Sequence, residues 1–166
     1  MSYSKKIAYG GFYTAITIIL LYLSYILPTS KLTILTLVSA VIPLSIITTG
    51  VKNTFIVFLS SFAVSFFIGL REMSLLYLLF FGIYGIIKYY IEVLSNIALI
   101  IFLKLIFFNI SLGLILLILK STLINIANVN LPFYSVIILA QFVFFIYDYC
   151  LTLIIFYMKD HFKFKI

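Results

Sequence analysis

Six long stretches of almost unbroken apolar residues divide this chain, and they restrict its fold more than any other feature. A helix needs about 20 mostly apolar residues to cross the hydrocarbon core of a bilayer. Each of the six runs reaches or approaches that length. They cover residues 7–27, 32–49, 54–70, 75–94, 97–119 and 133–158. The pattern therefore predicts a protein that crosses a membrane six times.

The composition excludes the main alternatives to a helical membrane protein. Of the 166 residues, 66% are hydrophobic and 9% are charged, whereas a soluble domain is about half apolar and about a quarter charged. A core of this size could not hide so much apolar surface from water, and a disordered chain would be polar. A membrane barrel would show alternating segments of about ten residues. We therefore expect an all-α, polytopic fold, with residues 1–166 forming one domain.

The distribution of lysine and arginine predicts the orientation in the membrane. Cytoplasmic loops carry an excess of these residues. We predict that both termini are cytoplasmic, because seven basic residues then lie inside and three lie outside, whereas the reverse orientation inverts this bias. The inner set is Lys5, Lys6, Lys52, Lys88, Lys159, Lys163 and Lys165, and the outer set is Lys31, Arg71 and Lys120. The net charge of +7 is spread along the chain as separate residues, so it does not indicate nucleic-acid binding.

Small residues form a smooth face on the first run. Gly11 and Ala15 are four residues apart and therefore share one side of a helix. In lipid, such a face lets a second helix approach closely. The second helix could belong to the same bundle or to a partner subunit.

Two ionisable residues fall well inside apolar runs, where charges are costly and often functional. At 1.5 Å per residue, Lys104 lies roughly 10 Å and Asp148 roughly 16 Å from the same membrane surface. Their runs are consecutive and antiparallel, so an ion pair between them is possible. In the alternative, Lys104 extends to the interface and Asp148 accepts a hydrogen bond from Tyr22 or Tyr25.

Other polar residues suggest structural roles rather than catalysis. We expect Lys88 and Glu92 to act as anchors at the membrane interface or as part of a docking surface, and Cys150 to be a small core residue. The only histidine, His161, follows the last run and is expected to be solvated. The sequence has no paired His/Glu cluster for a catalytic metal and no glycine-rich phosphate loop. We therefore expect a protein that is not an enzyme and has no cofactor.

Parts of the chain resemble a known transporter family. Residues 5–15 (KKIAYGGFYTA) and 21–24 (LYLS) look like the opening helix of S components. These are the membrane-embedded, substrate-binding subunits of energy-coupling factor (ECF) vitamin transporters. Pro43 in the second run, the following turn at residues 50–53 (GVKN), the chain length and the six spans also resemble that family.

The resemblance implies a function and a set of site residues. In S components, small residues of the first helix meet a transmembrane coupling subunit, and this role falls here on Gly11 and Ala15, although the family usually has two alanines. Substrate binds at the outer face, where Tyr25 and Tyr77 have the depth to line a pocket. The outer candidates are Tyr25, Thr29, Lys31, Arg71, Glu72, Tyr77, Asn125 and Asn128. The expected substrate is a vitamin or other small nutrient, with transport energised by separate coupling and ATPase subunits.

Two other functions are open at this stage. A stand-alone carrier or channel would need a continuous polar path through the membrane. The polar residues at mid-membrane depth are Lys104, Asn109, Gln141 and Asp148. A membrane scaffold protein without transport activity would need no binding residues at all. The heavy use of Ile, Phe, Tyr, Lys and Asn is typical of an AT-rich bacterial genome, so we expect a bacterial cell membrane as the location.

Overall fold

The computed structural model describes residues 3–123 and 133–161, and all regular structure within these ranges is helical. This confirms the predicted all-helical class. The elements are α1 (Tyr3–Ile26), the 3-10 helix η1 (Pro28–Ser30), α2 (Lys31–Thr49), α3 (Val51–Phe67), α4 (Arg71–Leu76), the π-helix η2 (Tyr77–Phe81), α5 (Gly82–Ile91), α6 (Ile97–Leu123) and α7 (Phe133–His161).

Five helical segments in the described part of the chain are long and apolar enough to cross a membrane. They are Ser4–Ile26, Lys31–Thr49, Arg71–Ile91, Ile97–Ile118 and Ile137–Tyr157. The third of these segments joins α4, η2 and α5 into one rod. Helix α3 is also apolar but has only 17 residues. These lengths and compositions are those of a multi-pass membrane protein.

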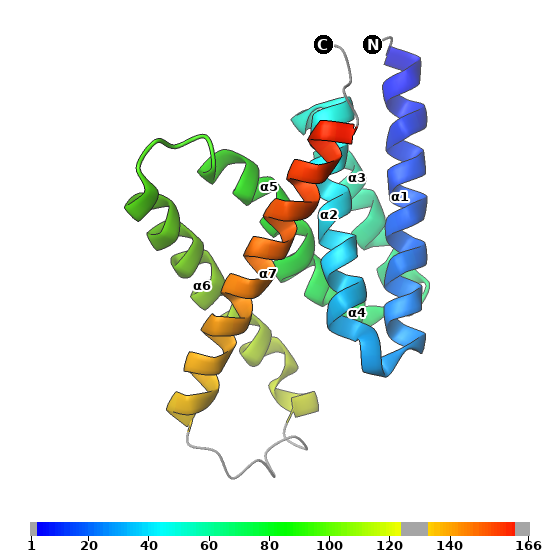
Figure 1. The fold of residues 1–166 in the computed structure, drawn as a ribbon. Helices are drawn as coiled ribbons and strands as arrows, with labels where there is room; N and C mark the ends of the chain where they lie inside the picture. Colours follow the sequence, from blue (N-terminus) through cyan, green and yellow to red (C-terminus); the bar gives the residue numbers. More distant parts are fainter. Residues whose placement is uncertain (1–2, 124–132, 162–166) are drawn as a thin grey trace.

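The helices form a close bundle and a more open pair (Figure 1). Helices α1, α2 and α3 pack against one another, and α2 also contacts α5 and α7. Helices α6 and α7 cross each other, and each begins away from the bundle, whereas the end of α7 lies beside α2. The start of α1 and the end of α7 lie at the same end of the molecule, which we call the terminal end. The opposite end, where η1 lies, is called the far end.

The boundary between α3 and α4 differs from the sequence prediction. We expected the third run to continue to residue 70, with Arg71 and Glu72 in a loop. Instead α3 ends at Phe67, because Gly69 adopts a φ of +101° that side chains other than glycine rarely tolerate. The backbone N–H of Leu70 then donates to the Ser65 carbonyl at 3.1 Å and closes the helix end. Arg71 and Glu72 form the first turn of α4.

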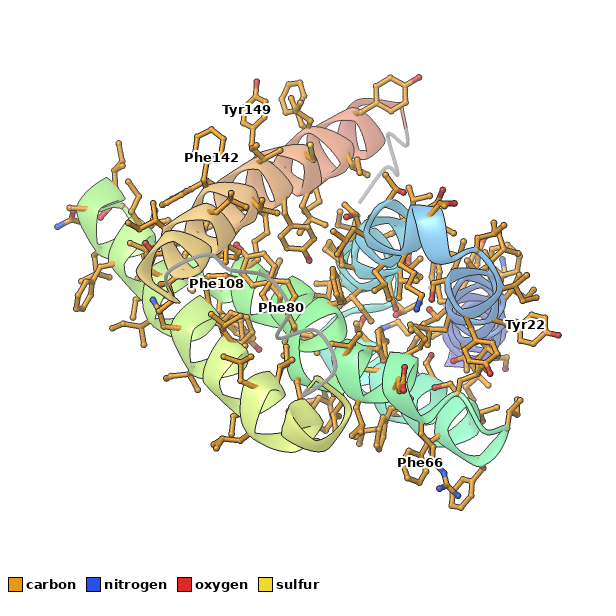
Figure 2. The ribbon with its side chains drawn as sticks, turned by 90° about the horizontal axis from the view of Figure 1, so that it is seen from below. Tyr22, Phe66, Phe80, Phe108, Phe142 and Tyr149 are labelled. Atoms are coloured by element: carbon orange, nitrogen blue, oxygen red, sulfur yellow. The ribbon has the colours of Figure 1, made fainter. Side chains whose placement is uncertain are left out.

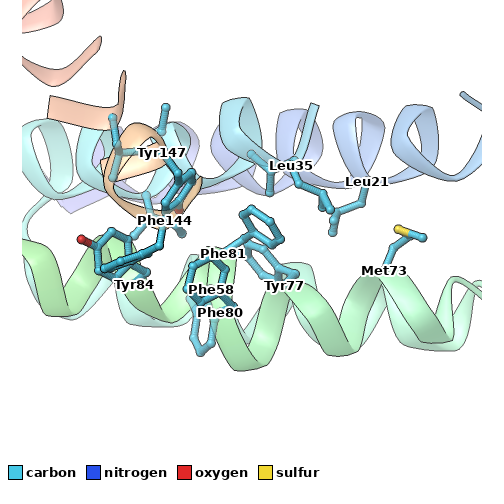
Figure 3. Packing of buried hydrophobic residues seen from close by; sticks show 14 of the residues in the cluster. Leu21, Leu35, Phe58, Met73, Tyr77, Phe80, Phe81, Tyr84, Phe144 and Tyr147 are labelled. Atoms are coloured by element: carbon cyan, nitrogen blue, oxygen red, sulfur yellow. The ribbon is translucent and has the colours of Figure 1, made fainter. Parts of the chain in front are cut away.

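Aromatic rings from three different spans meet in the hydrophobic core. We call this group the aromatic core, and its members are Phe80, Phe81, Tyr84, Phe108, Phe144 and Tyr147. Figure 3 shows those of the α5 rod and of α7. Phe108 and Phe144 stack with their ring centroids 4.5 Å apart, and Phe80 lies 5.4 Å from Tyr147. These rings connect the rod that contains α5 to the open pair of α6 and α7.

Two glycines let the α5 rod lie close to its neighbours. A Cβ atom on Gly82 would lie 2.7 Å from the rings of Phe58 and Tyr77, which is too close for a real contact. A Cβ atom on Gly85 would lie 2.9 Å from the Ile42 side chain in α2. The absence of a side chain at both positions therefore sets the spacing between α5 and the bundle.

Many large apolar side chains point outward, as expected for a surface in contact with lipid. Figure 2 shows Tyr22, Phe142 and Tyr149 on the outside, whereas Phe80 and Phe108 point inward. Helix α7 buries only one stripe of its surface. Our expectation that Cys150 lies in the core is wrong, because this residue falls off that stripe and is exposed.

Candidate functional site

Four charged side chains come together in the terminal half of the molecule, where α5, α6 and α7 meet. We call them the charge cluster, and they are Lys88, Glu92, Lys104 and Asp148. The rod ending in α5 supplies two of them, and α6 and α7 supply one each. The cluster has two positive and two negative groups, so its formal charge is zero.

Asp148 is the acceptor at the centre of the charge cluster. One carboxylate oxygen, Oδ1, accepts hydrogen bonds from the Lys88 ammonium group and from the Tyr84 hydroxyl, the latter at 2.5 Å. The other oxygen, Oδ2, accepts from Lys104 at 2.7 Å. The predicted ion pair between Lys104 and Asp148 is therefore present in the structure. The hydroxyl that bonds Asp148 belongs to Tyr84, not to the exposed Tyr22 or Tyr25.

Lys88 is the most deeply buried charge, with 1% of its surface exposed. Its ammonium group lies 2.8 Å from a Glu92 carboxylate oxygen and donates to the Thr152 hydroxyl at 2.8 Å. The expectation of an interface anchor is wrong for Lys88. Tyr84, Lys88 and Ile91 follow one another at helical spacing, and all three are buried. That spacing was the available signal that Lys88 lies on the inner stripe of α5.

The charge cluster joins three helices, α5, α6 and α7, through polar contacts. Hydrogen bonds to charged groups are strong in a low-dielectric environment, and each ammonium group here faces at least two acceptors. The second acid, Glu92, also contacts Lys104 at 3.4 Å and is 35% exposed. Since every charge has an opposite partner, the arrangement is suited to holding α5, α6 and α7 in one register.

An apolar cavity of about 310 Å³ lies in the far half of the molecule, between α2, the α5 rod, α6 and α7. Five aromatic rings line it: Phe80, Phe81, Phe108, Phe144 and Tyr147. The remaining wall consists of the aliphatic residues Leu32, Leu112, Ile115, Ala140 and Val143, together with Thr36. Pockets of this kind, concave and mostly apolar, are typical binding sites for small molecules.

The aromatic core stands between the charge cluster and the cavity. Tyr84 shows the division, because its hydroxyl bonds Asp148 while its ring packs against Phe80 at 5.9 Å between centroids. Phe80 and Tyr147 line the cavity on the other side. The two sites are thus adjacent but chemically separate.

The six predicted substrate-binding residues that the structure describes do not line this cavity. Tyr25 is 57% exposed, and Thr29 is also exposed. Lys31 is half-buried and precedes the lining residue Leu32, whereas Tyr77 is completely buried against Phe58. Arg71 and Glu72 are exposed on α4. The other two predicted residues, Asn125 and Asn128, lie outside the described residues.

A second hollow follows the small-residue face of α1. This groove has a volume of about 450 Å³ and runs between α1 and α3. Gly10, Gly11, Thr14 and Ala15 line it from α1, and no atom lies within 4 Å of the position that a Cβ on Gly11 would take. The predicted interface residues therefore border open space.

No protein-family model matches the chain, and neither a curated protein nor a solved structure matches it. Across the described residues, no group of three or more His, Cys, Asp and Glu side chains could hold a metal ion.

Proposed function

We propose that this chain is the membrane-embedded, substrate-binding subunit of a small-molecule uptake transporter, with the six-span architecture of an S component. Separate coupling and ATPase subunits would energise transport. The chain's own chemistry would be non-covalent recognition, in which ligand binding stabilises a closed arrangement of the helices around it. The observation that carries this proposal is the apolar cavity lined by four helical segments in the far half of the molecule.

The predicted orientation gives the cavity its role. If the terminal end faces the cytoplasm, as the seven-to-three division of basic residues favours, the far end faces outward. Leu32 and Thr36 lie near the start of α2, at the far end, and both line the cavity. The cavity would then be placed to capture a molecule from outside the cell, as uptake requires.

The groove beside α1 supports the partner part of the proposal. A coupling subunit needs a surface on which its helix can lie close to the binding subunit. Gly11 and Ala15 border a groove that leaves room for such an approach. The charge cluster is separate from this groove, since it lies between α5, α6 and α7.

Native mass spectrometry of the gently purified complex tests the proposal. We expect a retained small molecule and a co-purifying module that contains ATPase subunits. Leucine at both Gly11 and Ala15 should abolish the module and leave the ligand bound. The matched control places leucine at Tyr9 and Phe12, two exposed positions of α1 outside the groove, and should retain both.

Each other outcome contradicts a defined part of the proposal. A retained ligand with no partner would indicate a stand-alone carrier. A different partner complex with no ligand would indicate a scaffold protein. Wild-type levels of the ATPase module in the double-leucine variant would remove the groove from the partner interface.

A further inference from the structure

We infer that the ligand of the far-half cavity is a neutral, mostly apolar molecule with about the bulk of two fused rings. This inference rests on the proposed function, because it names the class of substrate for the same site. A ligand of this class places no charged group in the cavity, unlike an ionised, water-soluble nutrient.

The wall of the cavity is the first argument. Among the described residues that line the cavity, none is charged, and ten of the eleven have an apolar or aromatic side chain. The remaining one, Thr36, already donates its hydroxyl proton to the Leu32 carbonyl at 2.7 Å. The Tyr147 hydroxyl is also buried, and it has no hydrogen-bond partner among the described residues. A polar or ionic ligand would therefore lose its hydration and gain few partners.

The charges of the cluster are not available to a ligand. Asp148 follows the lining residue Tyr147, but both of its carboxylate oxygens accept hydrogen bonds from the charge cluster. Lys104 and Lys88 are bound to the same carboxylate. A charged ligand could use one of these groups as a counterion only by breaking an existing pair, and breaking a buried pair is costly.

The size and shape of the cavity give the second argument. An apolar cavity of about 150 Å³ is large enough to take up benzene. The present cavity, at about 310 Å³, has roughly twice that volume. Its five aromatic rings offer flat faces and edges, and aromatic ligands pack well against both. A flat molecule of two rings therefore fits the volume and the walls better than a long, flexible lipid chain.

A series of naphthalene compounds tests this class of ligand. The full-length protein in lipid nanodiscs is titrated with 2-naphthol, with the anion 2-naphthoate and with the cation 2-naphthylmethylammonium. The chain has no tryptophan, so its own fluorescence background comes from tyrosine, and empty nanodiscs give the background of the scaffold. We expect saturable binding of 2-naphthol, and binding of both charged compounds that is weaker by at least about 100-fold.

Cavity-filling variants locate the binding. Ala140→Phe adds a ring to the lining and should weaken 2-naphthol binding by at least about tenfold. Leu139→Phe is the matched control, because Leu139 is exposed on the adjacent face of α7 and should bind as the wild type does. If Ala140→Phe fails to fold, Ile115→Phe fills the same cavity from α6.

The possible outcomes separate the two proposals. Suppose that the affinity for a charged naphthalene is within about tenfold of the affinity for 2-naphthol, and that the filling variants weaken its binding. The inferred ligand class is then wrong, while the proposed function stands. If wild type and filling variants bind every probe equally, the cavity is not a binding site and both proposals fail. A phospholipid that is retained by the wild type, lost from Ala140→Phe and not displaced by 2-naphthol would identify a lipid chain as the occupant and overturn the inference.

Discussion

Removing the carboxylate of Asp148 is the most informative single perturbation of this structure. Asp148→Asn keeps the size of the side chain but takes away the shared acceptor of Lys88, Lys104 and Tyr84. The two lysines would then have only Glu92 as a counterion. That residue is 35% exposed and lies 3.4 Å from Lys104, so it compensates weakly.

The expected loss of stability follows from burial. Asp148 has 14% of its side chain exposed, and its partner Lys88 has 1%. Breaking a buried ion pair by removing one partner costs about 3–5 kcal/mol. Because Lys88 retains Glu92 at 2.8 Å and the Thr152 hydroxyl, we expect the lower figure, about 3 kcal/mol. Lys104→Met leaves Asp148 paired with Lys88, so about 2 kcal/mol is expected for that change.

The double variant measures the interaction itself. Lys104→Met combined with Asp148→Asn removes both members of the pair, so its cost should fall short of the sum by about 2 kcal/mol. Thermal unfolding in detergent is the assay. A loss of about 3 kcal/mol corresponds to a shift of about 6–12 °C for a chain of this length. Tyr149→Phe, exposed on the same helix, is the control and should change little. Additive single effects, within about 0.5 kcal/mol, would refute the coupling.

Three further predictions test other parts of the structure. In a variant without the native cysteine, a cysteine at Thr29 should react with a membrane-impermeant reagent added to intact cells, and one at Ser4 should not; the reverse result would invert the orientation. Gly82→Ala should lower the free energy of unfolding by about 1–3 kcal/mol, because its Cβ would lie 2.7 Å from buried rings, while Gly11→Ala should be tolerated; equal melting temperatures would contradict this packing. Tyr84→Phe keeps the ring but removes its hydrogen bond to the carboxylate of the charge cluster, so unfolding should require about 1.5–3 kcal/mol less, and an unchanged melting temperature would argue against that bond.

Much of the fold could be predicted from apolar run length alone. The run that begins at residue 32 and ends at 49 matches α2 (Lys31–Thr49) almost residue for residue. The boundary at Gly69 was missed, because a run of apolar residues carries no mark of where the backbone turns into a left-handed conformation. The glycine itself was the only local signal, and its position inside an apolar stretch concealed it.

The candidate site was harder to predict than the fold. The pair of Lys104 and Asp148 could be found, because charges deep in an apolar run need partners and depth can be counted along a helix. The cavity could not be found by searching for polar side chains, since its walls are apolar residues that look like ordinary core. The position of the space depends on the angle at which α6 and α7 cross (Figure 1). Hydropathy does not encode that angle.

The separation of charge and cavity has a common physical cause. A charge in a low-dielectric interior is stable only when it is paired, so the four charged groups gather where three helices can supply each with an opposite partner. Because these four groups are bound to one another, they are not free to bind a ligand. No charged side chain is found among the described residues that line the cavity in the far half, and there the aromatic rings leave a space that an apolar ligand can fill at low cost. Tyr84 joins the two halves, because one residue supplies a hydrogen-bond donor to the first and helps to form the aromatic core that bounds the second.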